Sequence, residues 1–225
     1  MFIRVPKFLN EEHLRFMDQV IATADFREGA ATAGGLARAV KNNLQMDIQS
    51  NEHRDELFTR VNQLILTNRV TRSSIMPRRM SLPVISQYKP GMTYGWHIDN
   101  PIMYVGAHPM RADVACTVFL NNSSDYDGGV LTVNSPAGDV SIRLEQGDAV
   151  FYPANNRHQV TEVTRGTRHA LVFWIQSMIQ DSAKRELMWE LEIACEKVRR
   201  DTPESEALLS IQKAQTSLLR MWSDL

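Results

Sequence analysis

Residues 147–177, GDAVFYPANNRHQVTEVTRGTRHALVFWIQS, alternate short runs rich in Val, Ile, Phe and Tyr with turn-forming residues. Runs of this kind between turn signals predict strands, here at 149–153, 157–163 and 168–176. The turn TRGT at 164–167 favours an antiparallel return of the last strand past the one before it. The stretch therefore predicts three consecutive strands of a mainly β core.

The same texture extends back to residue 81, which enlarges the predicted core. Further strands are expected at 82–88, 94–99, 113–121, 130–134 and 139–144, separated by the turns DYDGG, SPAG and EQGD. About eight short strands with close turn signals are typical of a sandwich, a jelly roll or a barrel.

The two ends of the chain read mainly as helices. Apolar residues recur at helical spacing after Asn10, a candidate N-cap, and again over 50–68. Two more helices are expected near the C-terminus, the last of them opened by Pro203. We therefore expect an α+β protein: residues 1–80 form a helical region packed on the core, residues 81–177 form the β core, and residues 178–225 form C-terminal helices.

Composition excludes several classes of protein. Hydrophobic residues make up 43% of the 225 residues, charged residues make up 23%, and the formal net charge is −1. These values indicate a globular protein with no bulk attraction to nucleic acid or to an anionic membrane. The first residues lack the long apolar core of a signal peptide, so we expect none, and no run approaches the roughly 20 apolar residues of a membrane span. Cys116 and Cys195 lack metal-binding spacing, so we expect buried thiols and a cytoplasmic location.

The segment GWHIDNP at 95–101 contains the first chemical signal. His97 and Asp99 are two positions apart, and side chains at i and i+2 of an extended chain point to the same face. One imidazole and one carboxylate would then face a common point, as two ligands of a metal ion. A third ligand must come from another segment.

Among the remaining histidines, His158 and His169 lie near predicted strand ends, whereas His13 and His53 lie in charged helices and His108 in an irregular segment. Arg168 helps to choose between the first two. Because adjacent strand residues face opposite sides, an inward Arg168 turns His169 outward. His158 is therefore the better third ligand.

Two histidines and one carboxylate on a β framework form the facial triad of non-haem Fe(II) oxygenases, which leaves three coordination positions open. A 2-oxo acid occupies two of these positions, and dioxygen takes the third. The planar fork of Arg168 suits the far carboxylate of such a co-substrate.

Several segments resemble one known family. QYKPGMTYGWHIDN, TVFLNNSSDYDGG, GDAVFYPANNRHQVTEVTRGTRHALVFWIQS and KNNLQ together resemble the PKHD-type hydroxylases, Fe(II)/2-oxoglutarate dioxygenases of the prolyl-4-hydroxylase-like superfamily. The resemblance implies a double-stranded β-helix core, with Fe(II) held by His97, Asp99 and His158. It also implies 2-oxoglutarate binding by Arg168 and Tyr88, with O2 as co-substrate and ascorbate as an additional reductant.

Two departures from the family pattern concern the cavity. The run PIMYVGAHPM after HIDN is unusually apolar, and Phe119 replaces a tyrosine that reaches 2-oxoglutarate in animal prolyl hydroxylases. Residues near this mouth are candidates for substrate contact, namely Asn43, Asn100, Met103 and Tyr104. Turn capping is an equal interpretation for Asn43, and plain packing is the expectation for Trp96 and Trp174.

The leading hypothesis is a hydroxylase that oxidises an unactivated C–H bond while 2-oxoglutarate decarboxylates to succinate and CO2. The short apolar segment 101–111 favours a small molecule such as an amino acid over a peptide side chain. Two further functions stay open: a non-catalytic iron or 2-oxoglutarate sensor, and a cupin-like protein for another metal. A homodimer through the apolar stripe of the C-terminal helices is a further expectation.

Overall fold

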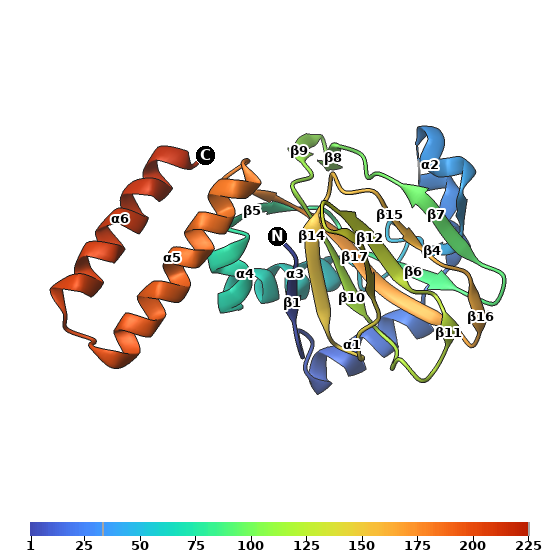
Figure 1. The fold of residues 1–225 in the computed structure, drawn as a ribbon. Coiled ribbons are helices and arrows are strands. Elements are labelled where there is room, and N and C mark those ends of the chain that lie inside the picture. The colour runs from blue at the N-terminus through green and yellow to red at the C-terminus, as the bar shows by residue number, and fades with distance from the viewer. Residues whose placement is uncertain (33, 225) are drawn as a thin grey trace.

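The core consists of two antiparallel β-sheets that face each other in a computed structural model, which describes residues 1–32 and 34–224 (Figure 1). The major sheet has the order β1 (Ile3–Val5), β14 (Ala149–Pro153), β10 (Val114–Phe119), β17 (Arg168–Ser177), β6 (Val84–Tyr88), β4 (Leu44–Met46) and β2 (Phe26–Glu28), with β5 (Pro77–Met80) paired to the end of β17. The minor sheet has the order β13 (Gly138–Ile142), β12 (Leu131–Ser135), β15 (His158–Val160), β7 (Thr93–His97) and β3 (Lys41–Asn42). The predicted mainly β, jelly-roll class with flanking helices is confirmed.

Strand alternation separates two apolar cores. On β10, Val114, Cys116 and Val118 pack into the layer under the helices, whereas Ala115 and Phe119 face the minor sheet. Burial on both faces explains why this strand reads as a continuous apolar run. The second of these cores lies between the sheets, beside the candidate site.

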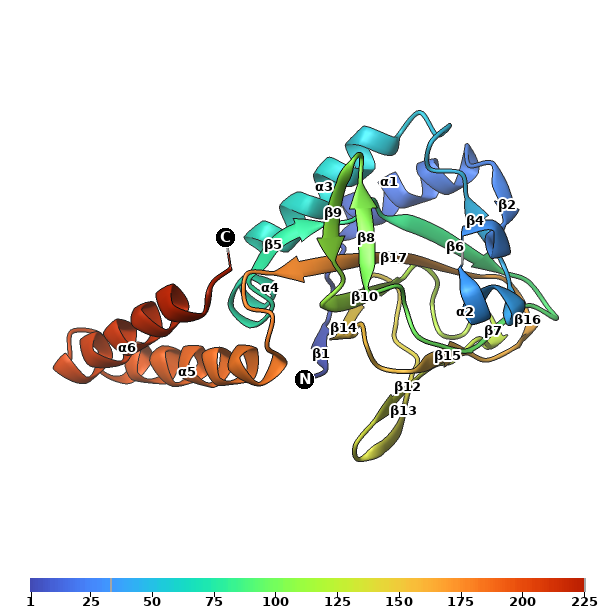
Figure 2. The same cartoon turned by 90° about the horizontal axis from the view of Figure 1, so that it is seen from above.

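Two long helices cover the outer face of the major sheet: α1 (Glu11–Ala22) and α3 (Arg54–Thr67) (Figure 2). Asn10 caps α1 as predicted, because its side-chain oxygen accepts from the His13 amide at 2.9 Å. The short α4 (Arg69–Ser74) follows α3, while η1 (Gly29–Thr32) and α2 (Gly35–Ala39) lie near β7. None of the helices in the described ranges has the length and apolar character needed to cross a membrane.

The C-terminal helices α5 (Ser182–Asp201) and α6 (Glu206–Trp222) pack on each other and extend away from the β core (Figure 1). Both were expected. Asp181 and Ser205, rather than Pro203, supply the N-caps. Cys195 on α5 and Cys116 on β10 are free and buried, as predicted.

The structure differs from the sequence expectations in three places. The first 80 residues contribute five strands as well as helices. The expected strand 157–163 is divided: β15 ends at Val160, and Val163 starts β16 (Val163–Arg165), which pairs with β11 (Asp127–Gly128). The segment expected to be irregular around His108 forms a hairpin of β8 (Ile102–Val105) and β9 (His108–Arg111), whose turn contains Gly106 at φ +60°.

Candidate metal centre

Two neighbouring strands of the minor sheet place the histidines side by side. His97 ends β7 and His158 begins β15, and the two residues are direct partners in the antiparallel ladder. Their imidazole centroids are 4.2 Å apart, and both residues are buried. Two segments that are far apart in the sequence thus present two nitrogen donors to one point.

Backbone carbonyls set the orientation of both imidazoles. His97 Nδ1 lies 2.8 Å from the Gly95 carbonyl oxygen, and His158 Nδ1 lies 3.0 Å from that of Asn156. A carbonyl only accepts, so each Nδ1 carries the proton and donates. Each Nε2 therefore keeps its lone pair, which is the form that a metal-ligating histidine needs.

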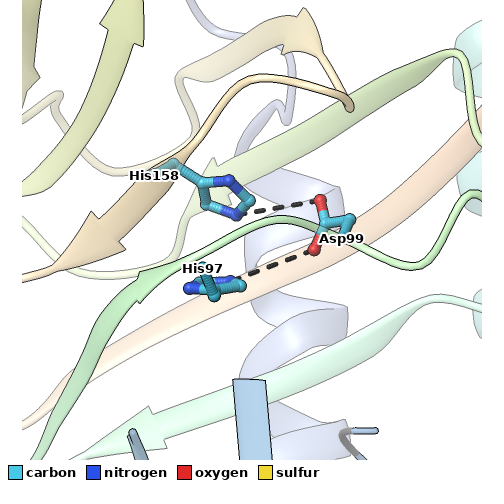
Figure 3. A group of neighbouring side chains, drawn as sticks. All are labelled: His97, Asp99 and His158. Carbon is cyan, nitrogen blue, oxygen red and sulfur yellow. Dashed lines mark ion pairs between the residues drawn. The ribbon is translucent and has the colours of Figure 1, made fainter. Parts of the chain in front are cut away.

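Asp99 completes the group, although it lies just beyond the end of β7 (Figure 3). Its Oδ1 is 3.9 Å from His97 Nε2, and its Oδ2 is 3.7 Å from His158 Nε2. The indole Nε1–H of Trp174 on β17 donates to Oδ2 at 2.8 Å. A residue of the major sheet thereby orients a carboxylate that follows a strand of the minor sheet.

The three donor atoms fit one metal ion. All lie within 4.8 Å of one another, and both imidazoles face the carboxylate. Donors on one face of an octahedron with bonds of about 2.1 Å are about 3 Å apart, so the His–Asp distances of 3.9 and 3.7 Å shorten by under about 1 Å when a metal binds. Two nitrogens and one oxygen suit Fe(II) and similar first-row metals.

Burial shifts the pKa values of His97 and Asp99 in opposite directions. Burial, the charge of His158 and that of Lys41 lower the pKa of His97 to about 3, against the Gly95 carbonyl, which raises it. His97 is therefore neutral at any pH near 7. Burial also raises the pKa of Asp99 above its usual range in the metal-free protein, and the nearby imidazole and indole oppose that shift. A cation at this point would restore full ionisation of the carboxyl group.

Arg168 is a buried cation at the cavity. It is 1% exposed, and its Nε and Nη2 have no hydrogen-bond partner within residues 1–32 and 34–224. Its guanidinium carbon lies 5.3 Å from the Tyr88 ring centre and 5.4 Å from that of Phe119. Unsatisfied buried donors are costly, and a negatively charged ligand in the cavity would remove that cost.

A cavity of about 170 Å³ between the sheets joins these groups. It is lined by the three candidate ligands, by Tyr88 and Arg168, and by Asn43, Asn100 and Met103 among the candidates for substrate contact. Tyr104 does not line it. Alternation on β8 turns Met103 toward the cavity and leaves Tyr104 67% exposed, so the structure does not bring Tyr104 to the site.

Three functional residues have no clear sequence signal. Trp174, expected only to pack, holds Asp99. Lys41 lines the cavity next to His97. Gly129, at φ +58°, leaves room for Arg168, since a Cβ there would lie 2.8 Å from Arg168 Cδ. The GG of DYDGG marks a turn in the sequence, but its contact with a distant strand is a tertiary feature.

We expect Trp174→Phe to weaken metal binding without unfolding the protein. The change keeps an aromatic ring and removes the hydrogen bond to Asp99, and loss of such outer-shell partners costs about 10- to 100-fold in metal affinity or activity. Competition titration with a fluorescent chelator measures the affinity. Trp96→Phe, which loses an indole outside the ligand set, is the control; equal metal affinity of W174F and wild type would contradict the role assigned to Trp174.

His169 faces away from the cavity, as predicted. Its Nε2 lies 2.9 Å from Gln87 Nε2, within hydrogen-bond distance. Burial, and then the charges of Arg168 and Lys89, lower the pKa of His169 to about 4. Because the unfolded chain binds this proton near pH 6.5, stability is expected to fall as pH drops from 6.5 toward 4. His169→Gln should reduce this slope by up to about 1 kcal/mol per pH unit in urea titrations. Parallel slopes for both proteins would refute the assignment.

Comparisons with known proteins agree with this geometry. The 2OG-Fe(II) oxygenase superfamily matches residues 83–176. A PKHD-type hydroxylase of Beijerinckia indica is 37% identical over 227 residues, covering 100% of both chains. A Trichoplax adhaerens prolyl hydroxylase in complex with a hypoxia inducible factor peptide superposes with a TM-score of 0.54 at 20% identity, covering 84% of this chain and 86% of that one. HygX from Streptomyces hygroscopicus, with nickel, 2-oxoglutarate and hygromycin B bound, gives 0.54 at 12% identity, with coverage of 78% and 82%.

Proposed function

The chain belongs to the PKHD-type hydroxylases, which makes it an Fe(II)/2-oxoglutarate-dependent dioxygenase, and on that basis we propose that it hydroxylates an unactivated C–H bond of a small molecule such as an amino acid. One observation supports the proposal above all others. Three metal-binding side chains within 4.8 Å of one another share a single cavity with a buried, unpartnered guanidinium.

We assign the iron to His97, Asp99 and His158. When bound, Fe(II) with 2-oxoglutarate and O2 supplies the oxidising chemistry, and 2-oxoglutarate leaves as succinate and CO2. The protein supplies position. Carbonyl oxygens fix both imidazole tautomers, and the Trp174 indole holds the carboxylate. The stacked ring of Tyr94, with its centroid 3.4 Å from that of His97, covers one side of this ligand.

We assign the far carboxylate of 2-oxoglutarate to Arg168. The two unpartnered nitrogens, Nε and Nη2, form one edge of the guanidinium fork, which matches a carboxylate in bidentate geometry. Tyr88 stands opposite Arg168 in the β6–β17 ladder. Phe119 has no hydroxyl group, so recognition of this carboxylate rests on Arg168 and Tyr88.

The size of the cavity favours a small substrate. About 170 Å³ must hold the co-substrate and the reacting part of the substrate together, between two sheets and beneath Met103. The second candidate is a protein or peptide side chain. The exposed Ile98 at the rim favours it, being 57% exposed and placed to contact a larger ligand.

The test is succinate formation from 2-oxoglutarate by the purified protein with Fe(II) and O2, alone and with metabolite or peptide pools. A hydroxylase consumes 2-oxoglutarate slowly alone and faster with a substrate. Stimulation by metabolites supports a small substrate, and stimulation by peptides alone supports the second candidate. Tight binding of Fe(II) and 2-oxoglutarate with no succinate under any condition would contradict the proposal and indicate a sensor.

A further inference from the structure

One extended segment, Lys41 to Met46, forms a polar wall of the cavity that the proposed chemistry leaves unused. Its first part pairs with β7 in the minor sheet and its second part pairs with β6 in the major sheet, so the segment closes one edge of the space between them. Alternate side chains, Lys41, Asn43 and Gln45, line the cavity. The intervening Asn42 turns away and donates to the Gly91 carbonyl at 3.1 Å.

Lys41 brings a second cation to the cavity that holds the metal ligands. It stands opposite Tyr94 in the β3–β7 ladder, its Nζ lies 5.1 Å from the centre of that ring, and the ring stacks on His97. Thr32 Oγ1 accepts a hydrogen bond from Nζ at 2.9 Å and holds the ammonium in place. The Thr32 hydroxyl group can donate its one proton to either of two nearby acceptors, the Gly29 carbonyl oxygen or the Gln45 side-chain oxygen.

The ammonium forms no ion pair with any residue that the structure describes. Across residues 1–32 and 34–224, no carboxylate lies within 4.0 Å of Lys41 Nζ, and Asp99, the acidic group that influences it, is assigned to the iron. Asn43, which is 4% exposed, adds a buried amide beside the Tyr88 hydroxyl group that has no other hydrogen-bond partner in these ranges. A half-buried ammonium without a carboxylate partner, on the same wall as this amide, suits a polar, negatively charged ligand.

The co-substrate does not account for this site. 2-Oxoglutarate has two carboxylates, of which one belongs at the metal and the other at Arg168. Arg168 is on the major sheet, against Tyr88 and Phe119, whereas Lys41 is on the edge strand of the minor sheet. Lys41 is therefore left for the molecule that is hydroxylated.

We propose that Lys41 binds a carboxylate of the primary substrate, with Asn43 as the neighbouring hydrogen-bonding group, so that the enzyme acts on small carboxylic acids of the amino-acid type. The inference rests on the proposed function and narrows it. A carboxylate anchored at Lys41 lies in the cavity that also holds the metal ligands, so that the rest of the molecule can extend toward the metal, where a C–H bond can react.

The experiment compares acids with their carboxamides. The probes are the L-amino acids and their N-acetyl derivatives, each as free acid and as carboxamide, added to wild type and to Lys41→Met, Lys41→Arg and Lys213→Met. Succinate release is the first readout. The second is the unfolding temperature of Mn(II)-loaded protein with 2-oxoglutarate in the absence of O2, which reports binding without turnover.

At least one free acid is expected to stimulate wild type, with its carboxamide about 10- to 100-fold weaker, because one charge-assisted hydrogen bond is lost. K41M should raise the KM for the acid by a similar factor. K41R, which keeps a positive charge, should have a KM for the acid much closer to that of wild type. K213M changes an exposed residue of α6 and should match wild type. The same acid should raise the unfolding temperature of wild type and not that of K41M. The KM for 2-oxoglutarate should stay unchanged throughout.

Three results would overturn the inference: no acid stimulates wild type, acids and carboxamides act equally, or K41M raises the KM for 2-oxoglutarate and not for the acid. The last would assign the ammonium to the co-substrate. In each case basal conversion of 2-oxoglutarate to succinate by wild type shows that the proposed function still holds. If basal conversion is also absent, the proposed function itself has failed.

Discussion

Arg168→Met is expected to raise the KM for 2-oxoglutarate by about 100-fold or more while the protein still binds metal. The fork of Arg168 offers two charge-assisted hydrogen bonds, each worth roughly 1.5–3 kcal/mol, and methionine offers none. Steady-state kinetics over a wide range of 2-oxoglutarate concentrations measures the change. Metal affinity should stay near that of wild type, because Arg168 contacts none of the three assigned ligands.

The same substitution is expected to leave the protein at least as stable as wild type when 2-oxoglutarate is absent. A buried guanidinium with two unpartnered nitrogens costs about 1–3 kcal/mol, and methionine fills similar space without that cost. Arg165→Met is the matched control, since Arg165 is exposed and paired with Asp127 on the neighbouring strand. An R168M protein with wild-type KM for 2-oxoglutarate, or one that fails to fold, would contradict the role assigned to Arg168.

His158→Ala should lose both iron binding and all succinate formation. It removes one of the three protein donors and leaves a carboxylate and one imidazole, which is too few to hold Fe(II) against water and competing chelators. Anaerobic titration with Fe(II) and 2-oxoglutarate should give a visible charge-transfer band in wild type that is missing in H158A. His169→Gln, which changes the other histidine near that strand end, should keep the band and the activity.

A retained band in H158A, or its loss in H169Q, would mean that the third ligand has been misassigned.

The alternation of side chains along a strand is the reason that the sequence predicts the third metal ligand. His158 was chosen over His169 because an inward Arg168 turns its neighbour outward, and the structure shows that arrangement. Strand alternation alone does not fix the position of Asp99. It lies beyond the last residue of β7, and its position also depends on a hydrogen bond from Trp174 on the opposite sheet.

Two contacts between distant segments were not predictable from the sequence. Nothing in the local pattern around Trp174 shows that it donates to Asp99 across the two sheets, and nothing around Lys41 shows that its short strand pairs beside Tyr94. The strands of the first 80 residues are two to four residues long, too short for a period-two pattern to stand out. They form because the edges of larger sheets are available to them.

The hairpin of β8 and β9, in contrast, has a recognisable signal in the sequence. IMYV and HPMR flank a two-residue turn that contains Gly106 at positive φ. Pro109 and the exposed His108 suggested an irregular loop, but β9 is an edge strand, where proline is tolerated. In this hairpin Met103 lines the cavity and Tyr104 lies outside it.

The most direct test is an anomalous diffraction map, collected at the iron edge, from crystals grown anaerobically with Fe(II) and 2-oxoglutarate. We predict one iron peak about 2.1 Å from His97 Nε2, His158 Nε2 and an Asp99 oxygen, with the far carboxylate of 2-oxoglutarate on the Arg168 fork. An iron peak away from these three residues, or 2-oxoglutarate bound without contact to Arg168, would contradict the account.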